Sequence, residues 1–184
     1  MNILAIDPGF DTTGWAVFRC RPDQLPQTLN HALGLLHATG EICTSTADPD
    51  HVRLASLAQQ MKNLLEAYFP VLVYLERPAY AGDYGGRRAR RAEVNKLYMA
   101  IGALQAVIRG PQLFTVPAIR TPKDTRHQLL SHAAQVSRVS LPEGPRGGAR
   151  QDQLDAIWLG CQALLERVAG DLRVFSPEVP AFLA

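Results

Sequence analysis

Short apolar runs alternate with long amphipathic segments in the second half of the chain, and this alternation is the strongest constraint on its fold. The run Val71–Leu75 has apolar side chains on both faces, as a strand buried beside a parallel neighbour does. Apolar residues recur at helical spacing before it, from Asp50, the expected N-cap, to Pro70, and after it, from Val94 to Ile108. Because parallel strands are joined by helical crossovers, the pattern predicts an α/β domain.

The first 43 residues predict neighbouring strands instead. An apolar run over residues 2–7 is broken by Pro8-Gly9 and resumes over 14–18, which indicates two strands joined by a tight turn. A loop over 20–31 precedes a third extended stretch, His31–Cys43. We therefore expect a three-stranded antiparallel meander at the start of the domain.

The remaining segments complete a mixed sheet. Residues 113–116 predict a fifth strand, a helix is expected from about Thr121 to Ala134, and a final amphipathic helix runs from Leu154 to Val168. Residues 77–91 and 137–149 are rich in glycine and arginine and are predicted to be basic loops. The expected α/β architecture is a mixed five-stranded sheet, the antiparallel meander plus two parallel strands, flanked by helices.

Length and composition bound the class of protein. A chain of 184 residues suits one domain of ordinary size, which we expect over residues 1–170, followed by a C-terminal tail over 171–184. Its 47% hydrophobic and 20% charged residues exclude a disordered chain, and no apolar run approaches the roughly 20 residues of a membrane span. Asp7 and Pro8 interrupt the first apolar run, so no secretory signal is indicated and a cytoplasmic location is expected.

The cysteines are Cys20, Cys43 and Cys161. They are odd in number, far apart and without metal-ligand spacing, so they predict neither a disulfide framework nor a zinc site. We expect all of them to be buried apolar residues.

The net charge of +2 conceals an uneven distribution along the chain. Residues 77–150 contain 13 Lys and Arg against 4 Asp and Glu, a net charge of +9, so the other residues sum to −7. A basic stretch of this kind is a candidate surface for a polyanion, although charges spread around a solvated surface would give the same count.

Four carboxylates occupy positions that such a fold would bring together. Asp7 ends the first predicted strand, Glu76 ends the buried strand, and Asp152 and Asp155 lie on one face of the last helix, in its first turn. Each has an ordinary explanation by itself, such as a turn residue or an acidic residue at a helix N-terminus. Together they predict a site for Mg²⁺ or Mn²⁺, hard cations that prefer carboxylate oxygens, with enough ligands for two ions and for phosphodiester cleavage.

These residues also carry a resemblance to a known family. Ile6–Gly9 followed by Thr13–Val17 resembles the opening signature of RuvC-type Holliday junction resolvases, members of the ribonuclease-H-like superfamily. The strand that ends at Glu76, the helix from Val94 to Ile108 and the segment Asp152–Ala156 follow in the order and approximate spacing of that family. The resemblance covers most of the chain.

The resemblance implies a ribonuclease-H-like fold and a metal-dependent endonuclease that resolves four-way DNA junctions by paired symmetric nicks, in recombination and repair. It implies a homodimer with two Mg²⁺ or Mn²⁺ ions in each active site. Asp7, Glu76, Asp152 and Asp155 would be the metal ligands, and a water activated by one ion would be the nucleophile. A branch-migration helicase is a partner that the resemblance suggests.

The resemblance also suggests residues that contact DNA. The loop after Glu76 is similar to the family segment that inserts an aromatic residue at the junction centre, so Tyr80 or Tyr84 would stack on an exposed base here, unless it only packs the loop. The basic residues expected to meet DNA are Arg87, Arg88, Arg90, Arg91, Arg120, Lys123 and Arg126. The family commonly has lysines before its last helix; arginines, one lysine and two histidines stand there in this chain, which leaves the charge-neutralising residue open.

Other functions fit parts of the pattern. Asp7–Thr12 partly matches the Asp-x-Gly-x-Thr phosphate loop of kinases and actin-like ATPases, but the threonine is one residue out of place and the chain is short for a second lobe. A related nuclease that acts on other branched DNA or on RNA stays open. A non-catalytic DNA-binding domain of the same fold would be expected to lose one or more of the four carboxylates, and all four are present.

Overall fold

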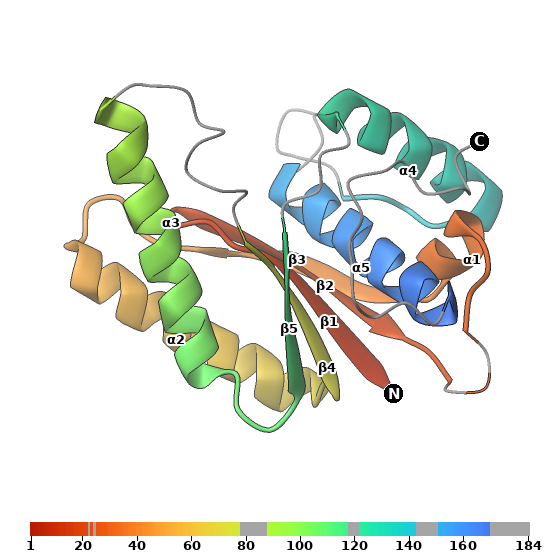
Figure 1. Cartoon of the computed structure of the whole chain (residues 1–184), viewed down its shortest axis with the longest axis horizontal. Coiled ribbons are helices and arrows are strands. Elements are labelled where there is room, and N and C mark those ends of the chain that lie inside the picture. The colour runs from red at the N-terminus through yellow and green to blue at the C-terminus, as the bar shows by residue number, and fades with distance from the viewer. Residues whose placement is uncertain (22, 24, 78–87, 118–121, 143–150, 170–184) are drawn as a thin grey trace.

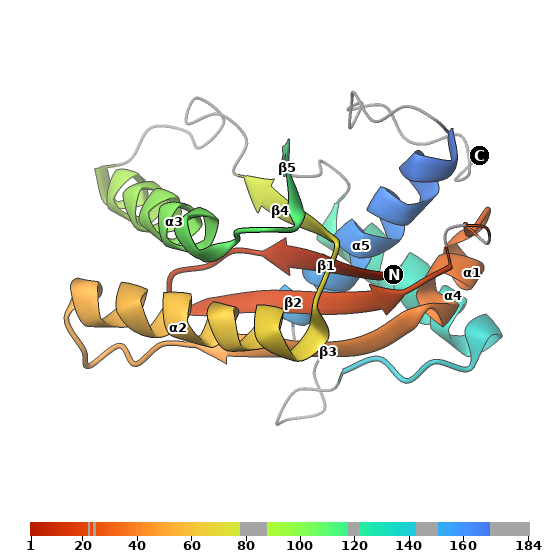
Figure 2. The same cartoon turned by 90° about the horizontal axis from the view of Figure 1, so that it is seen from below.

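The computed structural model of the chain shows a mixed five-stranded sheet with helices on both faces (Figures 1 and 2). It describes residues 1–21, 23, 25–77, 88–117, 122–142 and 151–169. The strands are β1 (Asn2–Asp7), β2 (Thr12–Arg19), β3 (Leu36–Cys43), β4 (Leu72–Arg77) and β5 (Gln112–Pro117). The helices are α1 (Leu29–Gly34), α2 (Asp50–Tyr68), α3 (Arg88–Val107), α4 (Lys123–Ser137) and α5 (Gln151–Ala169).

The sheet has the predicted architecture. Its strand order is β3-β2-β1-β4-β5. The pairs β1–β2 and β2–β3 are antiparallel, which confirms the meander, and β4 is parallel to both β1 and β5. The run with apolar residues on both faces is β4, which lies between two parallel neighbours as its composition predicted.

Alternation along β1 divides the core into two layers. Ile3 and Ala5 face the layer of α1, α4 and α5, whereas Leu4 and Ile6 face the layer of α2 and α3 (Figure 1). All of these side chains are fully buried. Because burial of a large aliphatic side chain contributes about 1.5–3 kcal/mol to stability, both layers hold the sheet in place.

Helix α5 approaches β2 closely enough to require glycine at two positions. A Cβ at Gly14 of β2 would overlap the backbone carbonyl of Asp152, at the start of α5. A Cβ at Gly160 of α5 would overlap the ring of Phe18 in β2. The contact at Gly14 seats the first turn of α5 on the end of β2 that lies next to Asp7, and the contact at Gly160 holds α5 against the other end of β2.

The sequence had predicted that His31–Cys43 is extended throughout, but in the structure only part of this stretch is extended. Its first part belongs to α1, which ends at Gly34, and only β3 is a strand. The hydroxyl of Thr28 caps α1 by accepting a hydrogen bond from the backbone N–H of His31, and Leu33 is fully buried against the core. Capping and burial together favour a helical turn over an extended conformation.

Three predicted boundaries also shift. Pro49 and Pro122 occupy the cap positions of α2 and α4, so Asp50 is the first residue of α2 rather than its cap. Its carboxylate forms an ion pair with Lys96 of α3 at 3.3 Å instead. The predicted basic loop over 77–91 ends earlier, because α3 already begins at Arg88. Residues 78–87 and 143–150, and the tail, lie outside the described residues.

Cys20 and Cys161 are buried, whereas the prediction of burial is wrong for Cys43, which is exposed at the end of β3. Burial raises the pKa of the Cys161 thiol above its usual range. None of the helices among the described residues is both long enough and apolar enough to span a bilayer.

Candidate functional site

Asp7 and Glu76 lie next to one another at one edge of the sheet. In the parallel pair of β1 and β4, Ile6 lies opposite Leu75, and the residue that follows on each strand is Asp7 or Glu76. Both carboxylate residues are partly buried. The sequence prediction that two chain-distant carboxylates meet at this edge therefore agrees with the strand register.

The first turn of α5 reaches the same edge through Gly14. This glycine pairs with Asp7 in the register of β1 and β2, and the backbone carbonyl of Asp152 lies against it. Figure 1 shows α5 lying across one face of the sheet. The backbone of Asp152 is thus one strand away from Asp7, which brings a third carboxylate residue into the neighbourhood of Asp7 and Glu76.

Asp155 lies on the inner side of the same turn, where it is only 5% exposed. One of its carboxylate oxygens accepts a hydrogen bond from Gln151 Nε2 at 2.7 Å, and the other lies 2.9 Å from Arg126 Nη1. Arg126 belongs to the first turn of α4 and is itself 6% exposed. The residue that we expected on a DNA-binding surface is therefore buried and forms an ion pair with a predicted metal ligand.

The chemistry of this site fits a divalent cation. Asp7, Glu76, Asp152 and Asp155 supply the hard oxygen donors that Mg²⁺ and Mn²⁺ prefer, and the strand register and the α5 contact bring their backbones to one place. Among the described residues, however, no three His, Cys, Asp or Glu side chains are already grouped so that they could hold a metal ion. The backbone is arranged for such a site, and Asp155 is engaged with Arg126.

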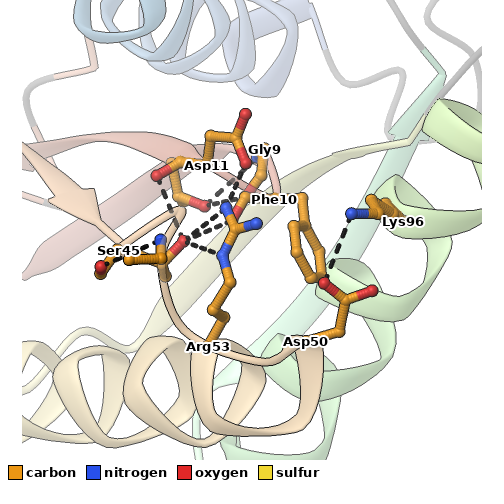
Figure 3. Close-up of polar contacts among 10 residues, drawn as sticks. Gly9, Phe10, Asp11, Ser45, Asp50, Arg53 and Lys96 are labelled. Atoms are coloured by element: carbon orange, nitrogen blue, oxygen red, sulfur yellow. Dashed lines mark hydrogen bonds and ion pairs between the residues drawn. The ribbon is translucent and has the colours of Figure 1, made fainter.

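A buried arginine supports the turn that follows Asp7 (Figure 3). Arg53 of α2 is 5% exposed and donates hydrogen bonds to the Thr44 hydroxyl, to the Phe10 carbonyl and to the Asp11 carboxylate. Its guanidinium also lies 4.3 Å from the centre of the Phe10 ring. Lys96 lies on the other side of that ring at 5.0 Å, so Phe10 is held between two cations. The cluster fixes the β1–β2 turn and, through it, the end of β1.

Sequence reasoning missed Arg53. It stands at helical spacing from Leu57, Met61 and Leu64, which are the other buried residues of α2. A charged residue in line with an apolar stripe is the signal that could have revealed it, because an arginine is buried only where acceptors surround it.

Most of the predicted DNA-contacting residues are not tested by the structure. Tyr80, Tyr84, Arg87 and Arg120 lie outside the described residues. Of the other five, Arg126 is the buried residue described above. The structure places the backbones of Arg88, Arg90 and Arg91 at the start of α3 and the backbone of Lys123 at the start of α4. Their contacts with DNA stay predictions.

Comparison with known proteins identifies a relative in sequence. No protein-family model matches the chain. The crossover junction endodeoxyribonuclease RuvC of Ruegeria pomeroyi is 33% identical to it over 86 residues, which are 47% of this chain and 46% of that protein. The chain is thus matched to about half the length of this curated relative.

Comparison with solved structures extends the likeness to nearly the whole chain. The RuvC structure of Thermus thermophilus matches with a TM-score of 0.62 at 15% identity, covering 92% of this chain and 97% of that one. The same protein in complex with a Holliday junction substrate matches with a TM-score of 0.59 at 19% identity, covering 92% and 96%. The yeast mitochondrial Holliday junction resolvase Ydc2 matches with a TM-score of 0.54 at 16% identity, covering 91% and 83%. The resemblance to RuvC-type resolvases is therefore confirmed, by sequence over about half of the chain and by fold over most of it.

Proposed function

We propose that this chain is a metal-dependent endonuclease that resolves four-way DNA junctions. The observation that carries the proposal is the convergence of Asp7, Glu76 and the first turn of α5 at one edge of the sheet. The likeness to a crossover junction endodeoxyribonuclease, and to a RuvC solved with a Holliday junction, supports the choice of substrate.

In this proposal Asp7, Glu76, Asp152 and Asp155 hold two divalent cations, Mg²⁺ or Mn²⁺. Bound there, the cations would lower the pKa of water and stabilise the charge that develops on the leaving oxygen. The protein holds the ligands in position: the β1–β4 register places Asp7 beside Glu76, the Arg53 hydrogen bonds fix the turn after Asp7, and Gly14 admits the backbone of Asp152.

The basic part of the chain would supply the DNA-binding surface. Residues 77–150 carry a net charge of +9, and this stretch begins directly after Glu76 and ends directly before α5. Arginine and lysine in this position would neutralise backbone phosphates and deliver the scissile bond to the carboxylates. A homodimer would give the two sites that paired nicks require, and a branch-migration helicase would be its partner.

The test is a cleavage assay. The purified chain should nick a four-way junction in Mg²⁺ or Mn²⁺, at paired positions, while a linear duplex of the same sequence stays intact and EDTA stops the reaction. Cleavage that persists in EDTA, or a junction that is left uncut with either ion, would contradict the proposal.

Two substitutions separate chemistry from DNA binding. Asp7→Asn and Glu76→Gln should each lower the cleavage rate by about 10³-fold, equivalent to about 4 kcal/mol, and leave junction binding intact, because a metal ligand acts on the reaction barrier. Glu66→Gln, which changes an exposed carboxylate of α2, is the matched control and should cleave normally. If junction binding is lost together with cleavage, Asp7 and Glu76 have a structural role instead.

A further inference from the structure

The Arg126–Asp155 contact places a cation that the protein itself supplies against one of the proposed metal ligands. The two side chains are 8% and 7% exposed, and Arg126 Nη1 lies 2.9 Å from a carboxylate oxygen of Asp155. An exposed ion pair of this kind would be weak, since water competes with it. A buried pair is different, because removal of either partner leaves an uncompensated charge in a low-dielectric environment.

The arginine is also incompletely satisfied where it lies. Its Nε–H is buried and has no hydrogen-bond partner among the described residues. Arginine at a carboxylate commonly uses two N–H groups in a bidentate contact, which would be the more stable arrangement. The guanidinium is thus held at Asp155 mainly by its charge.

We propose that Arg126 is the resident counter-ion of Asp155 and competes with a divalent cation for that carboxylate. A cation that uses Asp155 as a ligand must first displace the guanidinium or bind beside its positive charge. Either course weakens binding of the cation, so the charge of Arg126 sets how tightly an ion is held at Asp155. The inference rests on the proposed function, since it concerns how that metal site is filled.

The burial of both partners sets the size of the effect. Two opposite charges a few ångströms apart attract each other more strongly in a partly buried site than in water. Removing the charge of Arg126 should therefore strengthen Mn²⁺ binding about tenfold or more.

The experiment measures Mn²⁺ binding to the full chain by titration calorimetry, without DNA, so that it does not depend on nuclease activity. Arg126→Gln should bind Mn²⁺ about tenfold more tightly than the wild type. Arg138→Gln, which removes the same charge from the exposed end of α4, should match the wild type. In the double variant of Arg126→Gln with Asp155→Asn the gain should disappear, because it operates through the Asp155 carboxylate.

Arg126→Lys keeps the positive charge, so this variant should bind Mn²⁺ nearly as weakly as the wild type does. A second measurement needs no substitution of a buried residue: in the wild type, the Arg126 Nε–H resonance should shift when Mg²⁺ is added. This keeps the inference testable even where Arg126→Gln does not fold.

The outcomes distinguish the inference from the proposed function. If the wild type and Arg126→Gln bind Mn²⁺ equally, or if the double variant keeps the gain, Arg126 does not compete for Asp155, and the proposed nuclease is unaffected. An Nε–H resonance that Mg²⁺ leaves unchanged while the ion binds has the same meaning. If no variant binds Mn²⁺, both the metal site and the inference are wrong.

Discussion

The substitution Gly14→Ala tests whether α5 is seated on β2 as the structure shows. A Cβ at this position would overlap three backbone atoms, the carbonyl carbon and oxygen of Asp152 and the amide nitrogen of Gln153. Backbone cannot rotate away as a flexible side chain does, so the first turn of α5 must move. Overpacking of a well-packed site costs about 1–3 kcal/mol, and a backbone collision belongs at the upper end of that range.

Thermal unfolding measures the loss of stability. For a chain of this length about 1 kcal/mol shifts Tm by roughly 2–4 °C, so Gly14→Ala should unfold about 6–12 °C below the wild type. Gly102→Ala is the matched control, because Gly102 lies within α3 and a Cβ there would meet nothing within 4 Å. The control should be slightly more stable than the wild type, by about 0.5–1 kcal/mol, since alanine favours a helix.

Cleavage measures the second consequence. Displacement of Asp152 by about 1 Å relative to Asp7 should lower the cleavage rate by roughly 10²-fold, while the control cleaves normally. A Gly14→Ala variant with the Tm and the cleavage rate of the wild type would refute the reasoning, because it would show that α5 does not lie against Gly14. A lower Tm with an unchanged cleavage rate would show that α5 lies against Gly14 but that Asp152 does not take part in the reaction.

Two further predictions concern buried groups. Arg53→Met removes the hydrogen bonds to Thr44 and to the Phe10 carbonyl. The free energy of unfolding, measured by urea titration, should fall by about 2–4 kcal/mol. A fall of less than about 0.5 kcal/mol would contradict the role of Arg53 in the turn. In the native protein a thiol reagent at pH 8 should modify Cys43 and leave Cys20 and Cys161 unmodified. The reason is that the thiols of Cys20 and Cys161 are buried, and burial keeps the Cys161 thiol protonated. Rapid modification of Cys161 would contradict its place in the core.

Long periodic segments could be predicted from the sequence, because their signal is local. The helical spacing of apolar residues after Asp50 predicted α2, and the two-sided apolar run before Glu76 predicted a strand with parallel neighbours. Once the order of the strands was inferred, the meeting of Asp7 and Glu76 followed from chain geometry alone. Short elements were harder: α1 has six residues, and its apolar residues fit a strand equally well until burial decides.

The sequence by itself determined the mixed sheet and the carboxylates that line one edge of it, because both depend on patterns within single segments. Only the tertiary structure decided which charged residues are buried. The sequence shows no partner for Arg53 or Arg126, yet in the structure Arg53 is surrounded by the acceptors of the β1–β2 turn and Arg126 meets Asp155. The reason is physical: a charge is buried only where its partner lies close in space, and that partner stands in a segment distant along the chain.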